Sequence, residues 1–269
     1  MGKVMLTTDP NTLDLDLEGR SNGFLSLVKQ FETGKPNELG LMCRYDQNKF
    51  SPDLFVPLEV LRPKQLTNAI AKRQSEYLAG RSLAQTGLRL MGGSQTNIPK
   101  GPGGAPQWPE GVSGSISHSK GTCICLLYPS SQALVGVDIE TIGKDSAIAA
   151  ILRMVFTPLE RRLADTQSMF DKATFATVLF SAKETLYKLL FPVVEEYFGF
   201  PSAEMRTLPN SPVLRLYLTR DLHPTLPKGA FFDLNYKIYE DQVVTWSILK
   251  EGIGKDTHKH HVVQISVME

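Results

Sequence analysis

Short apolar stretches with alternating polar positions recur along the chain, and a repeat of two residues is typical of β-strands. The clearest case is residues 231–239, where Phe232, Leu234, Tyr236 and Ile238 alternate with other residues, as in a half-buried antiparallel strand. The other expected strands cover residues 24–28, 39–45, 114–119, 123–128, 133–140, 213–219 and 242–250.

Apolar residues spaced three and four apart predict helices over residues 63–85 and 173–191, and residues 141–172 look mostly helical. Within the last stretch, Thr157, Pro158 and Glu160 form a helix start signal. The threonine is expected to cap the N-terminus of the helix, the proline to take the first helical position and the glutamate to complete a capping box.

The helix expected at residues 63–85 carries two arginines on its apolar stripe, Arg73 and Arg81. A buried guanidinium is costly unless it is paired. One interpretation is internal pairing with Glu76 or another acid. The other is that both arginines line an anion-binding pocket, which suits the fork geometry of arginine. The stripe comprises Leu66, Ile70, Arg73, Tyr77, Arg81 and Ala84.

The helix expected at residues 173–191 has one apolar stripe, with Glu184 and Lys188 on the opposite side of the helical wheel. A Glu followed four residues later by Lys is the usual solvated helix pair and contributes only a few tenths of a kcal/mol. The stripe comprises Phe175, Leu179, Ala182, Leu186 and Leu189 or Leu190.

Residues 92–114 are rich in glycine and proline and predict a long loop that contains Lys100. It is not a P-loop, because no Gly-Lys-Ser/Thr ends it and no strand precedes it. A loop of this length is more often functional than idle. The next strand ends near His118, which suits either a structural or a functional histidine.

The pentapeptide Gly136–Glu140 closes an apolar strand. Since side chains alternate along a strand, Asp138 and Glu140 share one face, on which Gly136 leaves room for a ligand. Two adjacent carboxylates repel each other unless a cation lies between them, and Mg²⁺ is a natural candidate. The alternative is a strand end with two solvated acids.

Composition limits the classes of function. A net charge of +1 over 269 residues argues against general electrostatic binding of nucleic acid, and no apolar run approaches membrane-spanning length. Residues 1–20 lack the apolar core of a signal peptide. Cys43, Cys123 and Cys125 predict reduced thiols in a cytoplasmic protein. We interpret the tail histidines, His258, His260 and His261, as a surface segment rather than a metal site.

Four blocks of this sequence resemble the 4′-phosphopantetheinyl transferases, most closely the monomeric two-half group typified by the enterobactin synthase component. In order they are residues 72–81 (KRQSEYLAGR), 108–119, 136–140 (GVDIE) and 180–188 (FSAKETLYK). The last two together form the family signature. The resemblance spans roughly residues 60–190, and the flanking regions match nothing we could name.

The resemblance implies an α+β fold built as a pseudo-two-fold pair of similar halves. We expect the break near Thr141, with an N-terminal half, 1–141, that holds coenzyme A and the first metal carboxylates. The C-terminal half, 142–269, then carries the catalytic helix and the antiparallel strands. It also implies a monomer that binds neither nucleic acid nor membrane.

The implied reaction moves the phosphopantetheine arm of coenzyme A to a serine of an apo acyl, peptidyl or aryl carrier protein and releases 3′,5′-ADP. Asp138, Glu140 and Glu184 match the Mg²⁺ ligands, although relatives differ in whether the residue at the position of Glu140 binds the metal directly. Glu184 also matches the general base, and Lys188 the group that stabilises the leaving phosphate. The positions that match coenzyme A contacts are Arg73, Arg81, Lys100, Ser117, His118 and Lys183.

Two other classes compete with this hypothesis. A non-catalytic coenzyme A or nucleotide-binding module would keep the cations and lose the acids, yet all three acids and Lys188 are present. A Mg²⁺-dependent pyrophosphate hydrolase would use the same acids and need no carrier protein. A serine-hydrolase pair of Ser117 and His118 fails, because neighbours in a strand point apart.

Overall fold

A computed structural model describes residues 15–94, 96–209 and 211–251, so the tail histidines lie outside the described residues. The chain divides into two compact units, Met1–Val135 (unit 1) and Gly136–Glu269 (unit 2). This division falls before the break expected near Thr141. The reason is strand pairing: the strand that carries Asp138 and Glu140 lies beside the last strand, in the sheet of unit 2.

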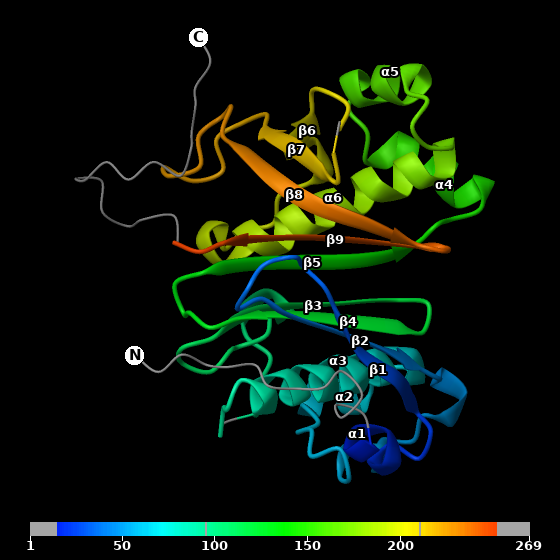
Figure 1. The fold of residues 1–269 in the computed structure, drawn as a ribbon, viewed down its shortest axis with the longest axis vertical. Coiled ribbons are helices and arrows are strands. Elements are labelled where there is room, and N and C mark those ends of the chain that lie inside the picture. The colour runs from blue at the N-terminus through cyan, green and yellow to red at the C-terminus, as the bar shows by residue number, and fades with distance from the viewer. Residues whose placement is uncertain (1–14, 95, 210, 252–269) are drawn as a thin grey trace. The chain divides into compact units, whose positions relative to one another are not determined.

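Unit 1 is a four-stranded antiparallel sheet, in the order β1-β2-β4-β3, with the long helix α3 packed on it (Figure 1). Its core brings Leu78, Leu83 and Leu88 of α3 against the sheet. The elements are α1 (Leu15–Arg20), β1 (Leu25–Phe31), β2 (Leu39–Tyr45), η1 (Gln47–Lys49), η2 (Pro52–Phe55), α2 (Lys64–Thr67), α3 (Ala71–Leu90), η3 (Pro102–Gly104), β3 (Ser113–Ser119) and β4 (Thr122–Tyr128).

The helix expected at residues 63–85 is in fact two helices, and its expected apolar stripe is only partly a core face, since Leu66 and Ala84 are buried in the core. Ile70 precedes α3 and is 72% exposed, whereas Leu78, Ala79 and Leu83 are fully buried. The helix lies so close to β4 that a Cβ at Gly87 would overlap the side chain of Leu127. The two arginines of the stripe therefore lie outside the main apolar face of the helix.

Unit 2 contains a five-stranded sheet in the order β5-β9-β8-β7-β6, with α6 packed against β8 and β9 (Figure 1). The strand pairs from β6 to β9 are antiparallel. The elements are β5 (Leu134–Thr141), α4 (Asp145–Met154), α5 (Pro158–Thr166), α6 (Lys172–Val194), η4 (Phe200–Ser202), β6 (Ala203–Met205), β7 (Val213–Leu218), β8 (Phe231–Tyr239) and β9 (Gln242–Leu249).

Gly136 has a different role from the one expected. A Cβ at this position would overlap the carbonyl oxygen of Thr185 and lie 3.0 Å from the Cβ of Leu189, both on α6. The missing side chain therefore permits close approach of β5 and α6, and it does not leave an open face for a ligand.

Most sequence predictions of local structure are confirmed. All the expected strands are present, the capping box at Thr157 forms, and the three cysteines are buried free thiols. The fold is α+β, with antiparallel pairing in both sheets, as expected. Among the described residues, no helix has the length and apolar character needed to cross a membrane.

Candidate functional site

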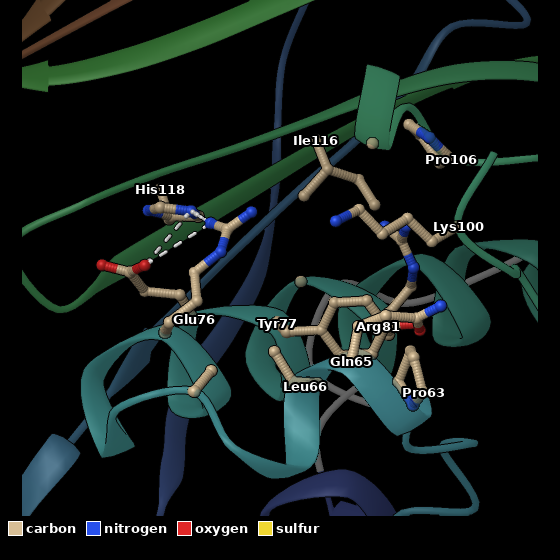
Figure 2. A pocket seen from close by; sticks show the side chains of 14 residues that line it. Pro63, Gln65, Leu66, Glu76, Tyr77, Arg81, Lys100, Pro106, Ile116 and His118 are labelled. Carbon is tan, nitrogen blue, oxygen red and sulfur yellow. Dashed lines mark hydrogen bonds and ion pairs between the residues drawn. The ribbon is translucent and has the colours of Figure 1, made fainter. Parts of the chain in front are cut away.

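Unit 1 contains a cavity of about 250 Å³ beside α3, β3 and the loop around Lys100, which we call the cationic pocket (Figure 2). Three of its lining residues are basic: Arg73, Arg81 and Lys100. Its lining is completed by Pro63, Gln65, Leu66, Ala69, Glu76, Tyr77, Gly80, Gly104, Pro106, Ile116 and His118.

Arg81 is the most firmly held of these cations, since the residue is only 7% exposed. Its Nε donates a 2.9 Å hydrogen bond to the carbonyl of Ile98, and its guanidinium lies 4.9 Å from the ring centre of Tyr77. The carbonyl and the ring fix the plane of the guanidinium at the pocket wall. This ordering lowers the entropy cost of binding an anion there.

Lys100 is positioned by a closed loop. Gly101 donates to the carbonyl of Ala105 at 2.8 Å, and Lys100 forms a β-bridge with Pro106. The lysine side chain crosses Gly104, where φ is +87° and a Cβ would lie 3.0 Å from the lysine Cε. Glycine thus supplies both the left-handed backbone and the space for this lysine.

Arg73, His118 and Glu76 form a triangle of side chains at one end of the pocket, and Figure 2 shows His118 beside Glu76. Nη1 of Arg73 lies 3.5 Å from Nε2 of His118, and Glu76 Oε2 lies 3.6 Å from the arginine and 3.8 Å from the histidine. The two interpretations of Arg73 therefore hold together, because it pairs with Glu76 and also lines the pocket.

Ser117 is not among the residues that line the cationic pocket, although it is buried in β3 next to His118. Strand alternation explains this, because neighbouring side chains leave a strand on opposite faces. The structure therefore brings Arg73, Arg81, Lys100 and His118 together, and its geometry adds no support for Ser117.

In unit 2, Asp138 is 2% exposed and is bonded through both carboxylate oxygens. Oδ1 accepts from Nζ of Lys188 at 2.6 Å, and Oδ2 accepts from Oγ of Ser181 at 2.8 Å. Ser181 in turn lies 2.9 Å from Oγ1 of Thr245 on β9. Three elements, β5, α6 and β9, thus fix the orientation of this carboxylate.

Lys188 is not the solvated partner of Glu184 that helix spacing suggested. Its Nζ bonds Asp138 and the carbonyl of Val137, and its side chain is 25% exposed. The simple pairing fails because α6 is buried around much of its circumference against the sheet, so its polar side also faces protein.

Glu184 lies in the same electrostatic environment as Asp138. Burial raises the pKa of the Glu184 carboxyl, the positive charge of Lys188 lowers it, and the negative charge of Asp138 raises it further. The net direction is upward, so in this protein the charged form of Glu184 is less stable than in water. A nearby divalent cation would relieve this repulsion.

Glu140 is half-buried, two residues beyond Asp138 on β5. Within the described part of the chain, no three carboxylate, imidazole or thiol side chains gather closely enough to hold a metal ion by themselves. Two carboxylates in one environment still suit Mg²⁺, which commonly takes one or two carboxylates and fills its other positions with water and phosphate oxygens. Asp138 and Glu184 are near enough for the charge of Asp138 to raise the pKa of the Glu184 carboxyl, as expected of such a pair.

Lys183 lies elsewhere than the coenzyme role would suggest. Its Nζ donates to Glu160 at 2.7 Å and to the carbonyls of Val155 and Phe200 at 2.9 and 3.3 Å. The side chain is 2% exposed, and burial lowers the pKa of the Lys183 ammonium while Glu160 partly offsets this. This geometry ties α5 and η4 to α6 and gives no support to coenzyme binding.

Sequence reasoning missed an aromatic cavity of about 160 Å³ in unit 2 that Glu184 also lines. The ring of Tyr187 lies 5.0 Å from that of Phe198 and 5.8 Å from that of Tyr197, which is 77% exposed. Of the aromatic residues that line it, only Tyr187 had a sequence signal, as a neighbour of Glu184 within the motif. The approach of residues 197–200 to it depends on the turn after α6.

Comparisons with known proteins match the parts of the chain that carry the cationic pocket and the Asp138–Lys188 pair. Residues 62–128 match the model of the 4′-phosphopantetheinyl transferase N-terminal domain, and residues 134–243 match that of the 4′-phosphopantetheinyl transferase superfamily. The first match contains the cationic pocket's arginines, and the second contains Asp138, Glu184 and Lys188.

Three relatives illustrate the similarity. The 4′-phosphopantetheinyl transferase Svp of Streptomyces mobaraensis is 30% identical over 58% of this chain and 64% of its own length. PptT of Mycobacterium tuberculosis is 30% identical over 52% and 61%, and enterobactin synthase component D of Escherichia coli O157:H7 is 39% identical over 46% and 58%. The matched part of the chain spans less than two thirds of each relative. The two family matches, on consecutive stretches, show that this chain belongs to the 4′-phosphopantetheinyl transferase superfamily.

Proposed function

We propose that this protein transfers the 4′-phosphopantetheine arm of coenzyme A to a serine of an apo carrier protein, releasing 3′,5′-ADP in a Mg²⁺-dependent reaction. The observation that supports this most directly is the grouping of signature residues in unit 2, where Lys188 bonds Asp138 and the charges of both shift the pKa of the Glu184 carboxyl. Relatives named as phosphopantetheinyl transferases support the same reaction class.

The cationic pocket of unit 1 is proposed to bind phosphate groups of coenzyme A. Arg81 is pre-oriented by Ile98 and Tyr77, and the closed loop fixes the backbone from which the exposed Lys100 side chain reaches the pocket. Arginine suits phosphate because its planar fork matches two oxygens at once. Arg73 and His118 complete this set, and Ser117 and Lys183 remain predictions.

The carboxylates of Asp138 and Glu184 would hold Mg²⁺, with Glu140 as a further predicted ligand. When bound, the ion would offset the charge of the coenzyme A pyrophosphate and polarise the phosphorus under attack. Asp138 is suited to this role because Ser181 and Lys188 fix its carboxylate before any ligand arrives. A fixed ligand avoids reorganisation during the reaction.

Glu184 is proposed as the general base. The carrier serine oxygen bonds to the β-phosphorus of coenzyme A, the bond from that phosphorus to the 3′,5′-ADP phosphate oxygen breaks, and the serine proton passes to Glu184 directly or through water. A carboxyl with a raised pKa is a stronger base than an ordinary glutamate. Lys188 would stabilise the negative charge on the departing phosphate.

The expected partner is an acyl, peptidyl or aryl carrier protein, from fatty-acid, polyketide or peptide-synthetase assembly. We propose that the enzyme acts as a monomer in the cytoplasm, and the three buried free thiols suit a reducing compartment.

The test is the intact mass of candidate apo carrier proteins after incubation with the full chain, Mg²⁺ and coenzyme A. We expect a gain of one phosphopantetheine arm on serine and equal release of 3′,5′-ADP, both abolished when the acceptor serine is replaced by alanine. If coenzyme A yields 3′,5′-ADP with Mg²⁺ and no carrier, the protein is a pyrophosphate hydrolase. If it binds coenzyme A and modifies no carrier of any class, it is a binding module.

A further inference from the structure

Glu76 is a carboxylate in a pocket that we propose to bind phosphates. Its negative charge would repel a bound phosphate, so its presence there calls for a physical explanation. Its side chain is 10% exposed, against 55% for Arg73 and 65% for Lys72. The carboxylate is thus the buried member of the group, and its cationic partners extend toward solvent. A carboxylate buried to this extent requires partners.

The partners of Glu76 come from different elements. On α3, Nζ of Lys72 lies 3.9 Å away and Nη1 of Arg73 lies 3.6 Å away, one turn earlier in the helix. On β3, Nε2 of His118 lies 3.8 Å away. The charge of Glu76 also reaches β2, where burial and then this carboxylate raise the pKa of Tyr45 to about 12. One carboxylate therefore links α3 to the sheet at the end of the pocket (Figure 2).

The separation of Arg73 and His118 makes this link consequential. The two nitrogens are 3.5 Å apart, so a protonated imidazole would be repelled by the guanidinium unless a negative charge lies beside both. Glu76 Oε2 is within 4 Å of each and supplies that charge.

We infer that Glu76 is a positioning residue, which holds Arg73 and His118 side by side so that both face a phosphate in the cationic pocket. This inference rests on the proposed function, since it assumes that coenzyme A phosphates occupy the pocket. Glu76 itself touches no substrate in this scheme and acts through its two neighbours.

A positioning role for Glu76 predicts that removing its negative charge weakens the binding of an anionic ligand. Were Glu76 only a negative charge near a polyanion, Glu76→Gln would remove repulsion and tighten binding. Were it only a charge, Glu76→Asp would change nothing. If it positions Arg73 and His118, both variants weaken binding, because glutamine lacks the charge and aspartate is one methylene too short to reach Arg73 and His118 together.

The experiment is calorimetric titration of the full chain with 3′,5′-ADP and, separately, with coenzyme A, without carrier protein. We expect each Glu76 variant to bind about tenfold more weakly, equivalent to about 1.4 kcal/mol. In transfer assays the KM for coenzyme A should rise by the same factor, while kcat at saturation stays within about twofold. Glu32→Gln is the matched control, since it removes one exposed acid of unit 1 that does not line the pocket.

Melting curves confirm folding, and if Glu76→Gln does not fold, Glu76→Asp decides the result. Binding equal to or tighter than that of the wild type in the folded variants would overturn the positioning role while leaving the proposed function intact. Failure of the wild type to bind either ligand would overturn the proposed function, and this inference with it.

Discussion

Replacing Lys183 with methionine separates a structural role from a coenzyme-binding role. Methionine has a similar length and no charge, so it fills the space of the lysine stem. The change removes the 2.7 Å ion pair with Glu160 and the donors to the carbonyls of Val155 and Phe200. Family resemblance alone would instead predict weaker binding of coenzyme A and an unchanged fold.

The magnitude follows from the burial of both partners. The side chains of Lys183 and Glu160 are 2% and 0% exposed, so removing the lysine leaves a carboxylate in the interior with only the backbone N–H groups of Thr157 and Met205. Breaking one side of a buried pair costs about 3–5 kcal/mol. In a protein of this size, that corresponds to a fall in melting temperature of roughly 6–20 °C.

The assay is thermal unfolding of the full chain, followed by steady-state kinetics below the transition. Lys172→Met, at the exposed start of the same helix, is the control and should shift the free energy of unfolding by no more than about 0.5 kcal/mol. A second substitution, Glu160→Gln, removes the stranded charge and should restore part of the loss, since the amide oxygen still accepts one backbone bond. The KM for coenzyme A should stay near the wild-type value in every folded variant.

The opposite pattern would refute this reasoning. Suppose that Lys183→Met has the same melting temperature as Lys172→Met while its KM for coenzyme A rises about tenfold. The ammonium of Lys183 would then contact the substrate, and its buried ion pair would contribute little to stability.

Three further perturbations test other parts of the structure. Arg81→Lys should raise the KM for coenzyme A about tenfold in steady-state assays, because lysine has no planar fork, and an unchanged KM would remove Arg81 from the phosphate site. Gly136→Ala should lower the free energy of unfolding by about 1–3 kcal/mol in urea titrations, because the new Cβ meets the Thr185 carbonyl, and an unchanged midpoint would contradict that close approach. Glu184→Gln should raise the melting temperature at pH 8 without metal. Because the folded pKa is raised, the carboxyl destabilises the fold increasingly as the pH rises from the unfolded value of about 4.3, and fully above the folded pKa; below the unfolded value the group is protonated in both states and the gain vanishes. A gain independent of pH would show that charge is not the cause.

The local structure was predictable where it depends on neighbours in sequence. Alternation gave the strand at residues 231–239, and the capping box gave the start of α5. The buried face of α3 was not predictable in this way, because residues that line a pocket follow the same helical period as residues that line a core.

The candidate site was likewise predictable only in its local sequence features. The residue types of the acidic motif and the Glu-Lys helix are visible in the sequence, but their partners are not. Asp138 meets Ser181 across 43 positions, and Ser181 meets Thr245 across 64. Lys183 likewise finds Glu160 across 23 positions. Such pairs depend on how strands and helices pack, which no local pattern specifies.

The most direct test of the central claim is the rate of carrier modification measured across a Mg²⁺ titration for the wild type and for Asp138→Asn. We predict a metal-dependent rate for the wild type and a loss of at least about a hundredfold for the variant at every Mg²⁺ concentration, as expected when a fixed ligand of a catalytic metal is removed. A variant that transfers the arm at the wild-type rate throughout the titration would contradict the assignment of Asp138 as a metal ligand.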